Sequence, residues 1–148
     1  MQNLIELLPV NPSIDQLSRI IGSVAAPAFL LGAVAAFISV LMSRTNRVID
    51  RSQFLHRIDD EAKSYLRADI PRLKRRAELL NRAVFYSTMC AIVTALLIVV
   101  AFASAMLGLA HEYGVALLFI VALLFFLLSL IDLARETRIA LRDVDHHA

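Results

Sequence analysis

The sequence has no tryptophan, one cysteine, four glycines and four prolines among its 148 residues. The lone cysteine, Cys90, excludes a disulfide within the chain, and its place in an apolar run predicts a small buried side chain. Charged residues make up only 19% of the chain, against 59% apolar residues. Because this balance is too apolar for a water-soluble domain of this length, the composition predicts a chain partly surrounded by lipid.

Charge is missing altogether from three long windows, residues 20–43, 83–110 and 113–131. A hydrocarbon core about 30 Å thick needs about twenty helical residues, which these windows provide or nearly provide. They lack the period-two alternation of a barrel strand, so we predict an all-α membrane protein with three transmembrane helices. The absence of Asp, Glu, Lys and Arg from the window interiors argues against proton-coupled pumps and transporters. Residues 1–19 lack the basic start of a cleaved signal peptide, so we interpret the first window as a retained span.

Basic residues are spread unevenly over the connecting segments. Eleven Lys and Arg lie in residues 43–82 and three in 132–148, against one in 1–19 and none in 110–113. Because Lys and Arg near span ends mark the cytoplasmic side, we predict an outer N-terminus and a cytoplasmic C-terminus. Six acids are interleaved with the eleven bases and no aromatic platform accompanies them. We therefore expect a solvated face that attracts anionic lipids, and no nucleic-acid partner.

Apolar residues continue at helical spacing beyond the windows, which predicts that the helices extend into a basic cytoplasmic helical hairpin over 44–82. Asp69 is a candidate cap and Pro71 suits a first turn. A C-terminal helix and tail over 132–148 could pack on the hairpin, and the outer tail 1–19 could hold a short interfacial helix after Asn11 and Pro12. The apolar positions are Val48, Leu55, Ile58, Ala62 and Tyr65, then Leu73, Ala77, Leu80 and Val84, and finally Leu133, Ala140, Leu141 and Val144.

Small residues recur every three or four positions along the first window. They are Ala25, Ala28, Gly32, Ala36, Ser39 and Ser43. Such a stripe allows another helix to approach closely in lipid. Packing within one chain, packing between copies and lining of a pore all stay open, and a pore would need several copies, because three helices are too few to enclose a channel. Pro27 interrupts the window, as a kink that Ser23 or neighbouring helices would relieve.

Charged residues also gather just beyond the three windows, at the predicted inner boundary. They are Arg44, Arg47, Arg82, Asp132, Arg135 and Glu136. At similar depth they could pair across helices, with Asp132 the acceptor for Arg44 or Arg82. Both an ion pair that fixes helix packing and a gate or ion site are open.

Signals for chemistry are few. His56, Asp59 and Asp60 have helical spacings that could hold a divalent ion, but so short a pattern arises readily by chance. The terminal "DHH" has no fixed scaffold, and no phosphate loop, nucleophile elbow or Cys/His quartet is present. We predict no enzyme, no cofactor and no metal site.

Four segments carry a family resemblance: "IIGSVAAPAFLL", "RTNRVIDRSQFL", "RRAELLNRA" and "FLLSLIDLARETRIAL". Together, over residues 19–142, they resemble the bacterial membrane-protein family known as domain of unknown function 2721. The resemblance implies a three-span protein of the bacterial inner membrane, and it implies no catalytic residue.

Two functions follow as expectations from these features. The first is a homo-oligomeric passive pore that conducts ions and is lined by the first span. The second is a membrane-anchored scaffold whose cytoplasmic hairpin binds a protein partner or anionic lipid. A continuous exposed apolar patch on Leu55, Ile58, Ala62 or Tyr65 would favour the scaffold.

Overall fold

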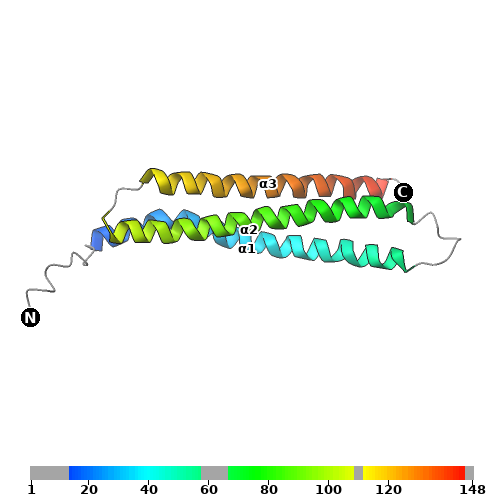
Figure 1. Cartoon of the computed structure of the whole chain (residues 1–148), viewed down its shortest axis with the longest axis horizontal. Coiled ribbons are helices and arrows are strands. Elements are labelled where there is room, and N and C mark those ends of the chain that lie inside the picture. The colour runs from blue at the N-terminus through cyan, green and yellow to red at the C-terminus, as the bar shows by residue number, and fades with distance from the viewer. Residues whose placement is uncertain (1–13, 58–66, 109–111, 146–148) are drawn as a thin grey trace, which may run out of the picture.

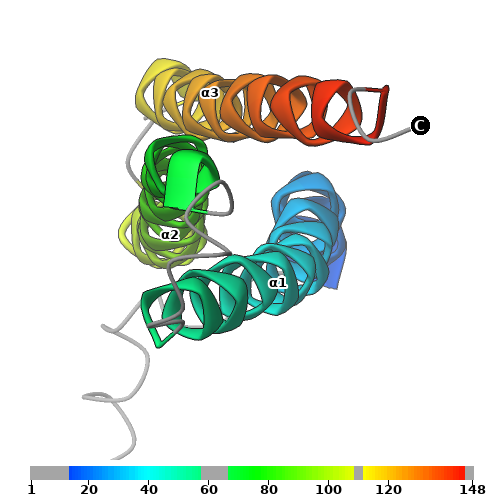
Figure 2. The same cartoon turned by 90° about the vertical axis from the view of Figure 1, so that its right-hand side faces the viewer.

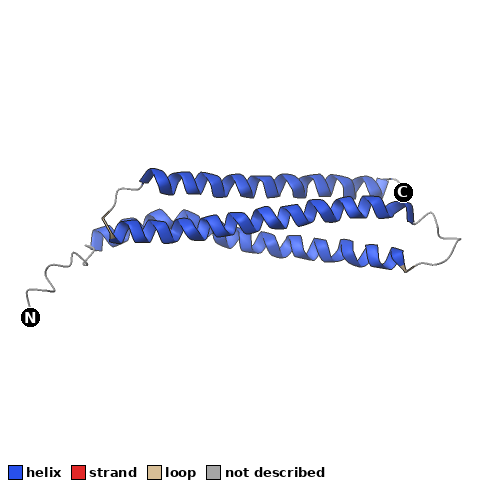
Figure 3. Ribbon diagram, viewed as in Figure 1, coloured by secondary structure: helices blue, strands red, loops and turns tan. Residues whose placement is uncertain are grey.

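The computed structural model of the chain describes residues 14–57, 67–108 and 112–145 (Figure 1). This part of the chain forms three long helices, α1 (Ile14–His56), α2 (Ile70–Met106) and α3 (Glu112–Asp145). Figure 3 shows almost all of the described residues as helix. Each helix contains a segment long and apolar enough to cross a membrane. The predicted all-helical architecture is thereby confirmed.

The three helices lie side by side along the long axis of the molecule, and each runs antiparallel to the next in sequence (Figure 1). α2 packs against both other helices, whereas α1 and α3 meet over a short stretch only (Figure 2). The 43 residues of α1 correspond to about 65 Å, roughly twice the thickness of a hydrocarbon core. A helix of this length that crosses a membrane must project well beyond it.

Buried side chains in the helices recur every seven residues, the period of left-handed coiled coils. The repeat keeps one seam of each helix facing its neighbour along the whole bundle. The buried positions in this register are Pro27, Val34, Leu41, Val48 and Leu55 in α1, Leu73, Leu80, Ser87, Thr94 and Ala101 in α2, and Ala122, Ser129 and Glu136 in α3.

The helix ends follow local rules. Asp69 occupies the N-cap position of α2, although its side chain makes no capping hydrogen bond, and Pro71 lies in the first turn. α2 ends where Gly108 adopts a φ of 64°, a left-handed conformation that glycine reaches without strain. α1 already begins at Ile14, so residues 14–19 are continuous with the first span. Asn11 and Pro12 lie outside the described residues.

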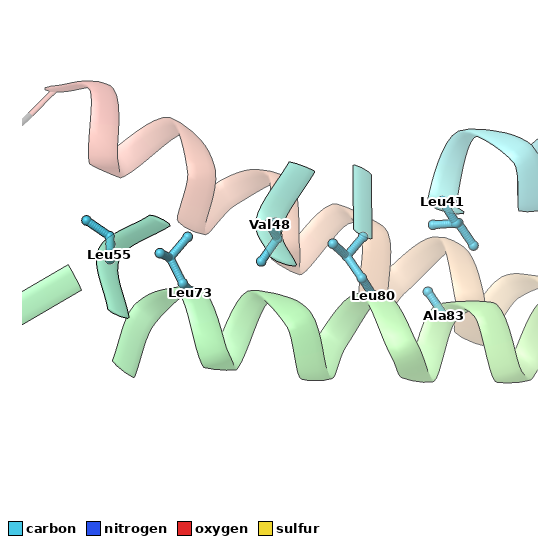
Figure 4. Packing of buried hydrophobic residues seen from close by; sticks show 6 residues of the cluster. All are labelled: Leu41, Val48, Leu55, Leu73, Leu80 and Ala83. Atoms are coloured by element: carbon cyan, nitrogen blue, oxygen red, sulfur yellow. The ribbon is translucent and has the colours of Figure 1, made fainter. Parts of the chain in front are cut away.

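Two differently built cores divide the bundle along its length. We call residues 41–57, 67–83 and 132–145 the basic half, and residues 14–40, 84–108 and 112–131 the apolar half. The core of the basic half is rich in leucine and valine, which interlock between α1 and α2 (Figure 4). The core of the apolar half is made mostly of small and hydroxylated side chains, with Leu97 as a fully buried leucine among them. Its buried members include Val34, Cys90, Ala122, Ser87, Thr94 and Ser129.

The extension of the helices beyond the apolar windows places several predicted positions in the core of the basic half. Leu73 and Leu80 are buried, with Ala77, Val84 and Leu133 packed against their cluster. Leu141 is 62% exposed, so it does not join this packing. Ile58, Ala62 and Tyr65, and the side chain of Val144, lie outside what the structure describes.

Candidate functional site

The most unusual buried group in the described chain is the carboxylate of Glu136, whose residue is 0% exposed. Arg76 donates from Nε and Nη2 to Oε1 at 2.9 and 2.8 Å. Arg44 donates from Nη1 to Oε2 at 2.9 Å and to the Thr137 hydroxyl at 3.1 Å. Because the three charged groups come from α1, α2 and α3, this cluster ties all three helices together at one level.

The cluster owes its stability to complete pairing of the acid. An unpaired carboxylate in the interior is very costly, whereas charge-assisted bonds from two guanidinium groups satisfy both oxygens. The Arg44 and Arg76 side chains are 41% and 20% exposed, so neither guanidinium group is completely shielded from solvent. The two arginines and one glutamate leave one positive charge in excess.

A second acid, Asp132, lies one turn before Glu136 on α3 and is 2% exposed. Its Oδ2 lies 3.4 Å from Arg82 Nε, and this oxygen has no hydrogen bond. The Arg82 guanidinium also lies 5.9 Å from the centre of the Tyr86 ring, in a cation–π arrangement. Of the two partners that the sequence offered for Asp132, the structure places Arg82 beside it, while Arg44 is bound to Glu136.

The remaining charges of the predicted layer lie elsewhere. Arg47 and Arg135 are exposed on separate faces, where each borders a groove. Sequence analysis missed Arg76, although its spacing from Leu73 and Leu80 places it on the buried seam of α2. Arg76 also lies seven residues before Ala83 in the sequence, so a seven-residue repeat of apolar positions predicts that it faces a neighbouring helix.

Hydroxyl groups connect α2 and α3 in the apolar half. Ser129 donates to the carbonyl of Ala83 at 2.6 Å, and its oxygen lies 2.8 Å from that of Ser87. Thr94 is also buried, and it donates to the carbonyl of Cys90 within α2. These short side chains allow the two backbones to come close, and the hydrogen bonds hold them there.

The small-residue stripe of α1 lies on the outside of the chain. Its members Ala25, Ala28, Gly32, Ala36, Ser39 and Ser43 are all exposed. A Cβ added to Gly32 would meet nothing within 4 Å, and Ser39 donates only to the carbonyl of Ala35 in its own helix. The stripe is therefore not used in packing within one chain.

Pro27 is buried in α1, where it removes the amide that would bond the carbonyl of Ser23. The Ser23 hydroxyl donates to the carbonyl of Ile20 at 2.8 Å, so it does not supply the missing bond.

Among the described residues, no group of three His, Cys, Asp or Glu side chains could hold a metal ion. His56 Nδ1 lies 2.7 Å from the carbonyl of Ser52. Asp59, Asp60 and the terminal histidines lie outside the described residues.

The fold and the buried charge layer define a class: an all-helical protein with three helices able to span a membrane and a layer of buried ion pairs where its apolar half meets its basic half. Its family is defined by sequence. The family described as Protein of unknown function (DUF2721) matches residues 24–146, so the chain belongs to this family, and the resemblance seen in the sequence is confirmed. No curated protein matches the chain. No solved structure matches it either.

Proposed function

We propose that this protein resides in the bacterial inner membrane with its apolar half in lipid and its basic half in the cytoplasm. The excess of arginine and lysine in the basic half supports this orientation, because such residues are retained on the inner side. The N-terminus is then outside, residues 44–82 and 132–148 are cytoplasmic, and the described helical parts 44–56, 70–82 and 132–145 project inward.

In this membrane, copies of the chain assemble through the outer face of α1 into a passive ion-conducting pore. The observation that supports this assembly is a contrast between outer faces. The exposed side chains of α2 and α3 are mostly large and apolar, as suits contact with acyl chains. In the apolar half of α1, Ile21, Phe29 and Val40 are also large and exposed, but most of the exposed side chains are small, most of those of the stripe among them. The large side chains include Phe85, Ile92, Leu96 and Val99 on α2 and Leu117, Ile120, Leu124 and Leu127 on α3.

Small side chains are typical of helix contacts in lipid, because there helices associate by close packing rather than by apolar burial. A ring of α1 helices would place Ser39 and Ser43 at the inner part of the path, near the arginines of the basic half. Hydroxyls and hydrophobic constrictions suffice for passive conduction, and no ionisable relay is needed.

Gly32→Leu tests the assembly. A leucine here is accommodated by the single chain, because its Cβ meets nothing, but it keeps two backbones apart. We expect native mass spectrometry from lipid nanodiscs to show loss of most oligomer, and vesicle flux to fall at least tenfold. Gly114→Leu is the matched control, since Gly114 of α3 is equally open, and it should preserve both. A wild-type chain that is monomeric in lipid contradicts the proposal.

Conduction itself is tested at Ser39. In a Ser39→Cys variant, a charged, water-soluble thiol reagent should block flux, because position 39 lines the water-filled path. The native Cys90 is buried, so the wild-type protein is the control for reaction elsewhere. If the protein forms oligomers that carry no ion current, the proposed assembly stands but the proposed pore is wrong.

A membrane-anchored scaffold is the second candidate, and a specific observation favours it. Ile49 and Phe54 of α1 are 42% and 62% exposed, and in the proposed orientation both lie beyond the membrane in water. Leu55, by contrast, is 1% exposed, so an apolar docking surface would centre on Phe54. A photo-crosslinker at position 54 should capture one defined protein in cells, whereas the same group at the lipid-facing position 85 should not.

A further inference from the structure

A basic groove runs between α2 and α3 on the surface of the basic half. We define the α2–α3 groove by the five arginines and one glutamate that line it together with Leu79 and Ile139. The charged residues are Arg75, Glu78, Arg82, Arg135, Arg138 and Arg142. The cavity has a volume of about 460 Å³, which is large enough for a phosphate-bearing headgroup.

Most of the arginines in the α2–α3 groove are not neutralised. Arg82 approaches Asp132, but Arg75, Arg135, Arg138 and Arg142 form no ion pair with a carboxylate of the described chain. Five guanidinium groups beside only two carboxylates, those of Glu78 and Asp132, repel one another unless an anion joins them. Arginine binds phosphate oxygens with paired N–H donors, so phosphate is the anion that this lining suits best.

A second basic groove provides a comparison on the same molecule. It lies beside α1 and α2 and is lined by Arg44, Arg47, Arg51 and Arg76 with Glu136. Here Glu136 already binds Arg44 and Arg76. Arg47 and Arg51 form no ion pair with a carboxylate of the described chain, against four such arginines in the α2–α3 groove. The α2–α3 groove is therefore the one with more unneutralised positive charge.

The position of the α2–α3 groove identifies the source of the phosphate. Arg82 immediately precedes the membrane window that begins at residue 83, and Arg135 lies four residues, about one helical turn, beyond the window that ends at residue 131. The groove continues outward for seven residues along each helix, which is about 10 Å. This is the depth of lipid headgroups at the inner face of a membrane in the proposed orientation.

We propose that the α2–α3 groove binds the phosphate-bearing headgroup of an anionic phospholipid of the inner leaflet. Arg82 and Arg135 contact the phosphate nearest the acyl chains, and Arg75, Arg138 and Arg142 contact the outer part of the headgroup. The side chains of Leu79 and Ile139 supply an apolar floor. This inference rests on the proposed membrane orientation, and it is independent of pore formation.

The test compares two double variants of the full chain in a zwitterionic detergent. Arg75→Gln with Arg138→Gln removes two charges from the α2–α3 groove, and Arg47→Gln with Arg51→Gln removes two from the other groove. Phosphatidylglycerol, phosphatidylcholine or inorganic pyrophosphate is titrated against each protein, and thermal unfolding is followed by helical circular dichroism. Each shift is measured from the lipid-free midpoint of the same variant, so a change in basal stability does not enter.

We expect phosphatidylglycerol to raise the unfolding midpoint of the wild type, while phosphatidylcholine has little effect. The α2–α3 groove variant should bind about thirtyfold more weakly, the loss expected for two basic side chains near an anionic surface. The control variant should bind within about threefold of the wild type. If phosphatidylglycerol binding is weakened equally in both variants, the lipid is attracted by the overall positive charge of the basic half, and the proposed site is wrong. The site is likewise overturned if pyrophosphate binds at least as well as the lipid, because the ligand would then be a soluble phosphate.

Failure of the proposed orientation is detected separately. Cysteine placed at position 53 of a Cys90→Ala chain should react with a membrane-impermeant reagent in inverted vesicles and not in intact cells. Reaction from outside would overturn the orientation and with it the inner-leaflet assignment, whatever the detergent titration gives. A protein that conducts no ions but retains selective lipid binding would overturn only the pore.

Discussion

The two halves of this bundle share the same three helices and the same seven-residue repeat, but they fill their cores with opposite kinds of side chain. In the basic half, leucine and valine lie inside and arginines cover the outside. In the apolar half, serine, threonine, cysteine, alanine and valine make up most of the buried side chains, Leu97 is also buried, and most leucine, isoleucine and phenylalanine side chains are exposed or only partly buried. The inversion takes place within each helix, near Leu41, Ala83 and Asp132.

This inversion indicates the surroundings for which each half is built. Water drives large apolar side chains into a core, so the basic half has the composition of a soluble coiled coil. Lipid offers no such force, and helices there are held by close packing of small residues and by hydrogen bonds. The buried ion pairs lie at the level where the leucine-rich core of the basic half gives way to the core of small and hydroxylated side chains in the apolar half.

Glu136→Gln should have the largest effect, because Glu136 is the one side chain in the described chain that forms ion pairs with both other helices. The variant leaves Arg44 and Arg76 facing each other without a carboxylate, and loss of one member of a buried ion cluster costs about 3–5 kcal/mol. Unfolding by SDS titration, followed by helicity, measures this loss. Glu78→Gln, on the exposed surface of the same half, is the matched control and should change stability little. Similar midpoints for the two variants would show that the cluster is not a tie between helices.

Leu80→Ala tests the water-facing core. Leu80 is 0% exposed among Leu41, Val48 and Ala83, and truncation of such a leucine costs about 2–5 kcal/mol. Leu141→Ala, at a 62% exposed position, should cost less than about 0.5 kcal/mol. The same denaturant titration compares them. If both truncations are mild, the basic half has no leucine core of the soluble kind.

Ser129→Ala tests the other half by the same measurement. The change removes the hydrogen bond to the Ala83 carbonyl and the contact with Ser87, and interhelical hydrogen bonds in membranes contribute about 0.5–1.5 kcal/mol. Ser39→Ala, which loses only a bond within α1, should be nearly neutral. A loss for Ser129→Ala as large as that for Leu80→Ala would contradict the contrast between the halves.

How far the sequence predicts this structure depends on the kind of pattern involved. Uncharged windows mark the helices well, because length and apolarity directly reflect membrane thickness. The helical spacing of Val48, Leu73 and Leu80 predicted that the helices continue beyond the apolar windows. The sequence could not predict which arginine pairs with each buried acid. Arg44 and Arg82 both lie near α3, and only the rotation of each helix about its axis decides which acid each arginine meets.

The same limit applies to the candidate site. The charge layer could be located from the ends of the windows, but Arg76 lies a full turn deeper in the basic half than Arg82 and was missed. The small stripe of α1 was visible in the sequence, although its spacing could not show whether it faced inward or outward. Both questions are settled by which seam of a helix its neighbours cover, and this depends on contacts between residues far apart in the chain.

Asp132→Asn is expected to have the smallest effect, although Asp132 is almost as buried as Glu136. Its partner Arg82 is 56% exposed and lies 3.4 Å away, so loss of the acid leaves a cation that its surroundings can still solvate. A neutral amide also spares the cost of burying a carboxylate oxygen that has no hydrogen bond. We expect a stability change below about 0.5 kcal/mol by SDS titration, with Glu136→Gln measured alongside. A cost that matches that of Glu136→Gln would mean that Asp132, too, is held in a closed ion cluster, and that the boundary between the two halves depends on both acids.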